Sequence, residues 1–286
     1  MNKHNKKRGH WRDIWVRLKR NRVAFVSLII LCVIILFTLF SEQIAPYSYD
    51  ERDLSNTFSL PTWQHPFGTD NLGRDMLSRV LVGGKISLLV AFVSVALAAV
   101  VGSVFGAMAG YFGGRLEFVI LKCNDVLMAI PAFLLAITVS VALGTGIMNT
   151  ALAVGITNIP RFVRLMRAET LSVKGKEYLD VARVCGGSDA YIIFRHVFPN
   201  ALSSTIVNVT LGISNAILQI SGLSFVGLGV RPPTPEWGSI LSTGRPYMLE
   251  FWPMVTFPGI AIVVTLVLFN LVGDGLRDAM DPKLKR

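Results

Sequence analysis

Long stretches without a charged residue constrain the fold of this chain more than any other feature. Residues 23–40, 86–114, 126–160, 201–230 and 251–272 contain no Asp, Glu, Lys or Arg and are mostly apolar. A helix crosses the hydrocarbon core of a bilayer with about 20 such residues. The stretch 126–160 is long enough for two spans joined at 144–146. The sequence therefore predicts an all-α integral membrane protein with six transmembrane helices, the first of them at 23–40.

The Lys and Arg residues are distributed unevenly around these predicted spans. The stretch 1–22 holds nine of the 28, residues 115–122 two, 161–200 seven and the C-terminal end four, whereas 41–85 and 231–250 together hold six. Loops on the cytosolic side of membrane proteins are enriched in Lys and Arg. We therefore expect a cytoplasmic basic N-terminus at 1–22, an extracytoplasmic segment at 41–85 and a cytoplasmic tail at 277–286. This rule also accounts for the net charge of +10 without nucleic acid.

One cytosolic stretch, residues 174–200, has the pattern of two short helices between membrane spans. Four apolar residues recur on one helical face: Tyr178, Leu179, Ala182 and Cys185. Gly186 and Gly187 are expected to end this first helix, because glycine accepts the positive φ found at helix ends. Ser188 can cap the second helix with Asp189 in its first turn, and Pro199 is expected to end it.

Such an element between two spans is suited to docking a soluble partner. The residues expected to form the contact are Glu177, Asp180, Ala182, Arg183, Gly186, Gly187, Ser188, Asp189, Arg195 and Pro199. The three cysteines, Cys32, Cys123 and Cys185, lie outside the predicted external segments, so no disulfide framework is expected.

This stretch resembles the EAA loop of binding-protein-dependent ABC importer permeases, whose pattern is E-A-A, three residues, G, nine residues, then I-x-L-P. Here the matching positions are Asp180-Val181-Ala182, then Gly186, then His196-Val197-Phe198-Pro199. The spacing agrees, while Asp replaces Glu, Val replaces the first Ala, and His-x-Phe replaces Ile-x-Leu. The runs at 68–79 and 232–238 resemble the dipeptide/oligopeptide, or peptide/nickel, branch of the same family.

The resemblance implies a MetI-like, type I permease domain over 86–276, in the cytoplasmic (inner) membrane of a bacterium or archaeon. It further implies a heterodimer with a second homologous permease, two cytosolic ATPase subunits, an extracytoplasmic substrate-binding protein and a peptide substrate. No cofactor is expected on this chain, and ATP and Mg would be bound by the ATPase partners. The chain lacks the phosphate-binding pattern, because Gly83-Gly84-Lys85 is followed by Ile86 and lacks the upstream glycine. We therefore expect a transport subunit without an ATPase site of its own.

One glycine-rich face and one amide-rich face indicate how the predicted spans pack. Gly102, Gly106 and Gly110 recur every four residues, a small-residue face that favours close approach of another helix. Asn208, Asn215 and Gln219 share one face of the predicted span 201–230. Amides facing lipid would be costly, so they are expected either to bind neighbouring helices or to line the substrate path.

Three alternatives remain open at this point. A nickel or metallophore importer of the same family shares every motif used above. A secondary transporter driven by an ion gradient would need carboxylates within the spans, and the uncharged stretches contain none. An intramembrane enzyme would need a catalytic set, and the four histidines have neither metal spacing nor a nucleophilic partner.

Overall fold

The computed structural model describes residues 10–280, and the described chain is almost entirely helical. The α helices are α1 (His10–Arg20), α2 (Arg22–Leu39), α3 (Ser41–Ile44), α4 (Met76–Phe112), α5 (Gly114–Ala129), α6 (Ala132–Leu143), α7 (Ile147–Lys174), α8 (Glu177–Val184), α9 (Asp189–Ile192), α10 (Phe198–Phe225), α11 (Trp237–Gly244) and α12 (Pro253–Met280). Two 3-10 turns, Leu54–Asn56 and Arg245–Tyr247, and a π-type turn, Ile193–Val197, complete the elements.

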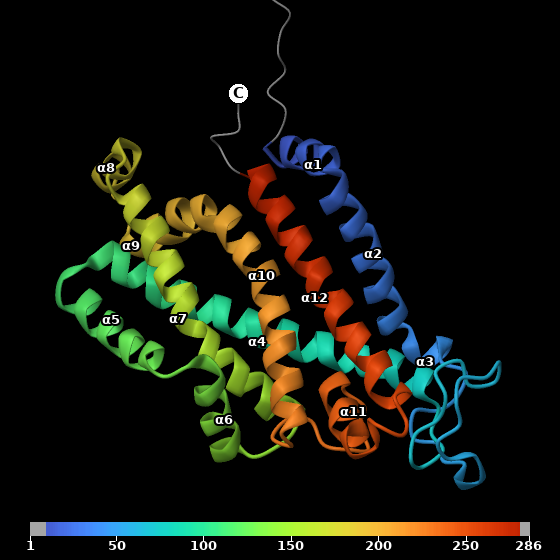
Figure 1. The fold of residues 1–286 in the computed structure, drawn as a ribbon. Helices are drawn as coiled ribbons and strands as arrows, with labels where there is room; N and C mark the ends of the chain where they lie inside the picture. The colour runs from blue at the N-terminus through green and yellow to red at the C-terminus, as the bar shows by residue number, and fades with distance from the viewer. Residues whose placement is uncertain (1–9, 281–286) are drawn as a thin grey trace, which may run out of the picture.

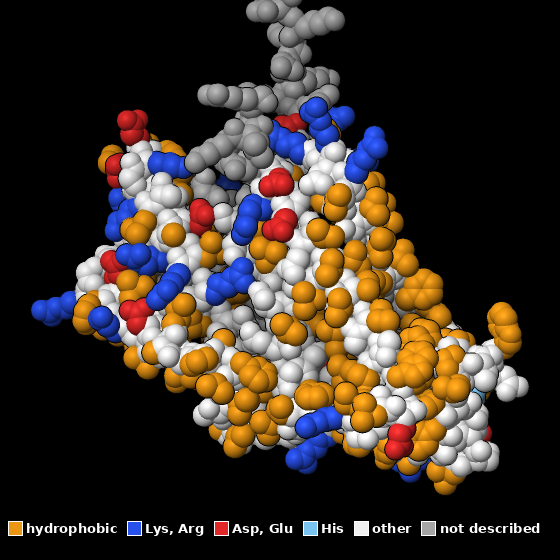
Figure 2. Space-filling view, viewed as in Figure 1, with side chains coloured by type: hydrophobic (Ala, Val, Ile, Leu, Met, Phe, Trp, Pro, Cys, Tyr) orange, Lys and Arg blue, Asp and Glu red, His pale blue; other side chains and the backbone are white. Residues whose placement is uncertain are grey.

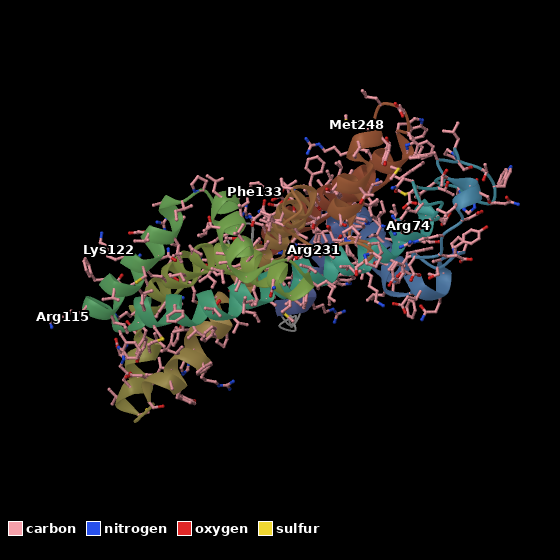
Figure 3. All side chains as sticks on the ribbon, turned by 90° about the horizontal axis from the view of Figure 1, so that it is seen from below. Arg74, Arg115, Lys122, Phe133, Arg231 and Met248 are labelled. Carbon is pink, nitrogen blue, oxygen red and sulfur yellow. The ribbon has the colours of Figure 1, made fainter. Side chains whose placement is uncertain are left out.

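The long helices run between two ends of the molecule. Figure 1 shows α1, α8 and the last turn of α12 at one end, which we call the α8 end, and α3 and α11 at the opposite end, which we call the α11 end. Helices α2, α10 and α12 connect the two ends, and α4 crosses behind them. Viewed from below, Arg74 and Arg115 mark the two ends of α4 (Figure 3).

The described helices are consistent with the predicted six spans, but length and hydropathy identify only four, or five if one bent pair counts as a span. Within the described residues, α2, α4, the helical run Asp189–Phe225 and α12 are each long and apolar enough to cross a membrane. Helices α5 and α6 are together long and apolar enough as well, but they are bent by 93° at Pro131, as in a broken span or a re-entrant loop. Helix α7 follows where the sequence predicts a further span, but it continues past its apolar half through three arginines, and its mean hydropathy is below that of the other candidates.

The predicted glycine face on α4 is confirmed, and α7 is the helix that packs against it. A Cβ atom at Gly102 would lie 2.5 Å from Cβ of Phe162, and one at Gly106 would lie 2.5 Å from the backbone oxygen of Val163. At Gly110 the nearest atom would be Cβ of Thr170, at 2.7 Å. Because no side chain fits between the backbones, these glycines allow the two helices to touch along two turns.

The segment that precedes α4 is held by buried charges. Nε of Arg74 donates to Asp70 at 2.6 Å, and Nε of Arg79 lies 3.6 Å from the same carboxylate. Asp75 accepts hydrogen bonds from the backbone and hydroxyl of Ser78 and contacts His65 at 2.9 Å. Each buried charge therefore has a polar partner, which burial requires.

A second buried carboxylate anchors α11. Glu236 is fully buried and accepts hydrogen bonds from the hydroxyl of Ser87 on α4 and from the first backbone N–H groups of α11. The indole of the next residue, Trp237, donates to the backbone oxygen of Val80 at 2.9 Å. The Pro-rich run at 232–238 thereby fixes α11 against α4. Helix α11 is too short to cross a membrane.

The start of α4 and the form of the N-terminal stretch add to the prediction. Helix α4 begins at Met76 rather than near residue 86, because the charges that interrupt the apolar pattern are neutralised: Arg79 by Asp70, and Lys85 by Glu42 at 2.7 Å. The described part of the basic N-terminal stretch forms α1, an amphipathic helix whose Ile14 and Leu18 are buried against Ala24 and Ala279.

We predict that Gly106→Val destabilises the chain by about 1–3 kcal/mol, the usual range for an overpacked contact. The added side chain must displace the α7 backbone. Gly259→Val is the matched control, since a Cβ at Gly259 on α12 meets no atom within 4 Å. Thermal unfolding in detergent should separate the two variants. Equal melting temperatures would contradict the close α4–α7 contact.

Candidate docking element and transport path

Helix α8 is positioned by two residues of its predicted apolar face. Leu179 is completely buried and Ala182 is half-buried against the end of α4, α7 and α9. Tyr178 and Cys185, the other two residues of that face, are exposed. On the outer side Val181 and Val184 are exposed, Val184 to 88%, beside Glu177, Asp180 and Arg183. Helix α8 thus presents apolar side chains to solvent.

The predicted end of α8 at Gly186 and Gly187 is confirmed. The amide of Gly186 donates to the backbone oxygen of Arg183, and that of Gly187 donates to that of Ala182, both at 2.9 Å. Gly186 has a φ of +83° and is surrounded by open space. At Gly187 a Cβ would lie 2.8 Å from the backbone oxygen of Ala182. The two glycines therefore serve different needs: backbone conformation at the first and space at the second.

Ser188 caps the second helix as predicted, while the role expected of Pro199 is wrong. The Ser188 hydroxyl accepts a hydrogen bond from the amide of Tyr191 at 3.3 Å, and Asp189 lies in the first turn. Helix α9 does not end at Pro199. It passes through the π-type turn at Ile193–Val197 into α10, where Pro199 occupies the first turn. Pro199 therefore lies within one continuous helical run and does not end it.

Tyr111 joins the docking element to α4, and the sequence analysis did not single it out. Its hydroxyl donates to Asp189 at 2.6 Å, and the guanidinium of Arg183 lies over its ring, 5.4 Å from the centroid. Arg183 also pairs with Asp180 at 3.0 Å. The pKa of Arg183 is raised above its ordinary value, mainly by contact with the Tyr111 hydroxyl and to a smaller extent by Asp180. The only sequence signal for Tyr111 is its place at the end of the glycine face.

Helices α5 and α7 are tied together next to this element. Arg167 donates through Nε to Glu117 at 2.6 Å, and Arg164 pairs with Asp125 at 2.8 Å. The ammonium of Lys174 donates to the backbone oxygen of Gly110 at 3.4 Å. Figure 2 shows Lys, Arg, Asp and Glu side chains gathered on the α8 side of the molecule, and Figure 1 shows α8 projecting beyond the long helices.

The three amides on α10 lie along it as predicted, but in different environments. Asn208 accepts a hydrogen bond from Arg161 of α7 at 3.0 Å, and Gln219 accepts one from Thr157 of α7 at 3.3 Å. Asn215 is exposed and donates only to the backbone oxygen of Leu211 in its own helix. Two of the amides therefore join helices within the chain, and Asn215 alone of the three is free to face a path or a partner.

A pocket of about 240 Å³ with a mixed polar and apolar lining opens beside Asn208 at the α8 end of α7, α10 and α12. Its lining residues are Leu165, Ser203, Ser204, Val207, Asn208, Arg277 and Met280. In the sequence, Arg161 is simply the first charged residue after the uncharged stretch 126–160. Its contact with Asn208 instead places a guanidinium between two helices next to this pocket. The described residues hold no group of three His, Cys, Asp or Glu suited to a metal ion.

The comparisons with known proteins agree with this geometry. Residues 102–286 match the model for the binding-protein-dependent transport system inner membrane component, and residues 9–61 match that for the N-terminal TM domain of oligopeptide transport permease C. The chain is 40% identical to the dipeptide transport system permease protein DppC of Alkalihalophilus pseudofirmus, over 96% of this chain and 90% of that one. It is 42% identical to the glutathione transport system permease protein GsiD of Escherichia coli, over 97% and 92%.

Among solved structures, the inward-facing MetNI methionine ABC transporter contains a chain of the same fold. The TM-score is 0.57 at 17% identity, covering 72% of this chain and 98% of that one. The helix order, the docking element and the sequence relatives together lead to one conclusion: the chain belongs to the binding-protein-dependent transport system inner membrane component family of ABC importer permeases.

Proposed function

We propose that this chain is one of two permease subunits of an ATP-driven importer of dipeptides and oligopeptides in the cytoplasmic membrane. The observation that carries the proposal is the exposed α8–Gly186–α9 element, mounted where the ends of α4 and α7 meet. The identity to the dipeptide permease over almost the whole chain supports the substrate class. The α8 end, where most of the basic residues lie, faces the cytosol in this proposal.

The energy comes from two cytosolic ATPase subunits, which bind ATP and Mg. The outer side of α8 supplies what a soluble partner needs for recognition: the exposed Val181 and Val184 flanked by Glu177 and Asp180. An apolar centre with a charged rim is the usual composition of a protein interface. Arg195 is also exposed, on the turn that leads into α10, and extends this surface toward the membrane.

Alternating access follows from how the docking element is connected. When the ATPase subunits close on ATP, α8 and α9 move with them, and Tyr111 and the buried Leu179 transmit that movement to α4 and α7. A second homologous permease completes the pathway, so the two subunits swing between inward- and outward-facing states. An extracytoplasmic binding protein delivers the peptide at the α11 end.

Asn215 is the residue that we assign to the substrate path. A peptide carries amide groups along its whole length, and a weak uncharged hydrogen-bonding side chain lets varied sequences pass without being held. Asn208 and Gln219 contribute differently, by keeping α7 and α10 in register beside that path.

Glutathione is the second candidate substrate, since the glutathione permease of Escherichia coli is as similar as the dipeptide permease. Uptake by vesicles containing the purified complex should be measured with dipeptides, longer peptides, glutathione and chelated nickel. We expect ATP-dependent uptake of dipeptides or oligopeptides. Uptake of chelated nickel alone would contradict the peptide proposal, and uptake of glutathione alone would restrict it to that tripeptide.

We predict that Gly186→Leu uncouples ATP hydrolysis from transport while the chain still inserts and assembles. A leucine there needs a φ near +83°, which costs roughly 1–2 kcal/mol, and its side chain projects from the docking tip. The matched control is Gly175→Leu, at the other end of α8, where φ is −87° and the space is also open. The ratio of peptides transported to ATP hydrolysed should fall several-fold only in the first variant. A wild-type ratio for Gly186→Leu would refute the docking role.

We predict that Asn215→Leu lowers peptide transport several-fold and leaves assembly and basal ATP hydrolysis near normal. Asn208→Leu provides the contrast, because it removes the acceptor of Arg161 and should lower thermal stability by about 1–3 kcal/mol. Transport assays and size-exclusion chromatography would distinguish the variants. If Asn215→Leu separates the permease pair instead, the residue belongs to the subunit contact and not to the path.

A further inference from the structure

The corner between α1 and α2 has a composition that transport does not explain. Helix α1 lies across the α8 end of α2 and α12 (Figure 1). Ile14 and Leu18 hold it there by packing against Ala24 and Ala279. The side chain of Asn21 caps α2 by accepting a hydrogen bond from the amide of Ala24 at 3.2 Å. Since only Asn21 separates the two helices, their relative angle is fixed by local structure.

Two aromatic rings and an ammonium group meet on the outer side of this corner. Trp15 of α1 and Phe25 of α2 pack edge to face, with centroids 6.1 Å apart. The ammonium of Lys19 lies 5.2 Å from the centroid of Trp15 and 5.8 Å from that of Phe25. Trp15 remains 46% exposed beside Val16, which is 47% exposed. The cation is thus held at a defined place above an apolar surface.

The charge around these rings is mostly positive, with Asp13 the one carboxylate on α1 itself. Arg12, Lys19, Arg20 and Arg22 are all exposed. Within residues 10–280, none of these four side chains forms an ion pair with a carboxylate. Figure 2 shows Lys and Arg side chains clustered over this end of the molecule. A surface of this kind attracts an anion.

The position of the corner relative to the membrane identifies that anion. Helix α2 enters the hydrocarbon core from Arg22 onward, and Val23 and Val26 on its surface are exposed to the surroundings. The corner therefore lies at the level of the lipid headgroups, where Trp and Lys residues are typically found. A soluble phosphate ion would leave Trp15 and Val16 in contact with water, whereas a phospholipid covers them.

We propose that α1 and the first turn of α2 form a binding site for the headgroup of an anionic phospholipid. Arg12, Lys19 and Arg20 bind the phosphate, while Trp15 and Phe25 contact the glycerol and the upper acyl chains. The site holds the N-terminal helices at the membrane surface, and it is independent of which substrate the permease carries.

The test uses the full chain, purified in the complex that accompanies it, in detergent micelles. Phosphatidylglycerol or phosphatidylcholine is titrated, and bound lipid is counted by native mass spectrometry. We expect phosphatidylglycerol to bind at least about tenfold more tightly, given three favourable charges. The triple variant Arg12→Gln, Lys19→Gln and Arg20→Gln should abolish this preference. Trp15→Ala, which keeps every charge, should weaken binding of both lipids.

The matched control is Lys3→Gln, Lys6→Gln and Lys7→Gln, which removes the same charge from the preceding part of the chain. This variant should keep the preference within about threefold. A loss equal to that of the α1 variant would show general attraction to the N-terminal charge and overturn the proposed site. Equal affinity for the two lipids would also overturn it, as would displacement of phosphatidylglycerol by inorganic phosphate at constant ionic strength.

Discussion

The contact between α4 and α7 is the constraint on which the rest of the structure depends. Helices in a membrane gain little from burying apolar surface, because lipid is equally apolar, so they associate through close packing. Gly102, Gly106 and Gly110 allow that packing where any larger residue would overlap the α7 backbone. As a result, the last turn of α4 and the last turn of α7 converge, and the docking element begins where they meet.

The docking element is held in place by the junction between the last turns of α4 and α7. Tyr111, on α4, binds Asp189 and contacts Arg183, so both helices of the element are attached to one residue. Arg167 and Glu117 extend the connection to α5. Under the proposed function, we therefore expect a force on α8 to move α4, α5 and α7 together, whereas a flexible loop would dissipate it. This arrangement is what coupling between an ATPase and a membrane pathway requires.

Much of this architecture is predictable from residue patterns that act locally. The glycine face of α4, the end of α8 at Gly186 and the cap at Ser188 each follow from a conformational or steric property of the residue concerned. The family resemblance follows from the spacing of Asp180-Val181-Ala182, Gly186 and Pro199. Local signals succeed here because the physical cause lies within a few residues of the pattern.

The errors arise where a partner distant in sequence changes the local preference. The start of α4 was not recognised because Arg79 and Lys85 are neutralised by Asp70 and Glu42, which precede the helix. Pro199 was expected to end a helix, yet the π-type turn before it lets the chain continue. Tyr111 and Arg161 were missed because only the fold brings Asp189 and Asn208 to them.

The claim that the docking element, α4, α5 and α7 form one rigid unit is tested most directly by distances between native cysteines. Cys123 on α5 and Cys185 at the end of α8 are both exposed and suited to spin labels in a Cys32→Ser background. Double electron–electron resonance on the assembled transporter should give the same distance between the labels at Cys123 and Cys185 with and without bound ATP. A change of several ångströms in that distance on ATP binding would contradict the account, since the element would then move independently of the helices that carry it.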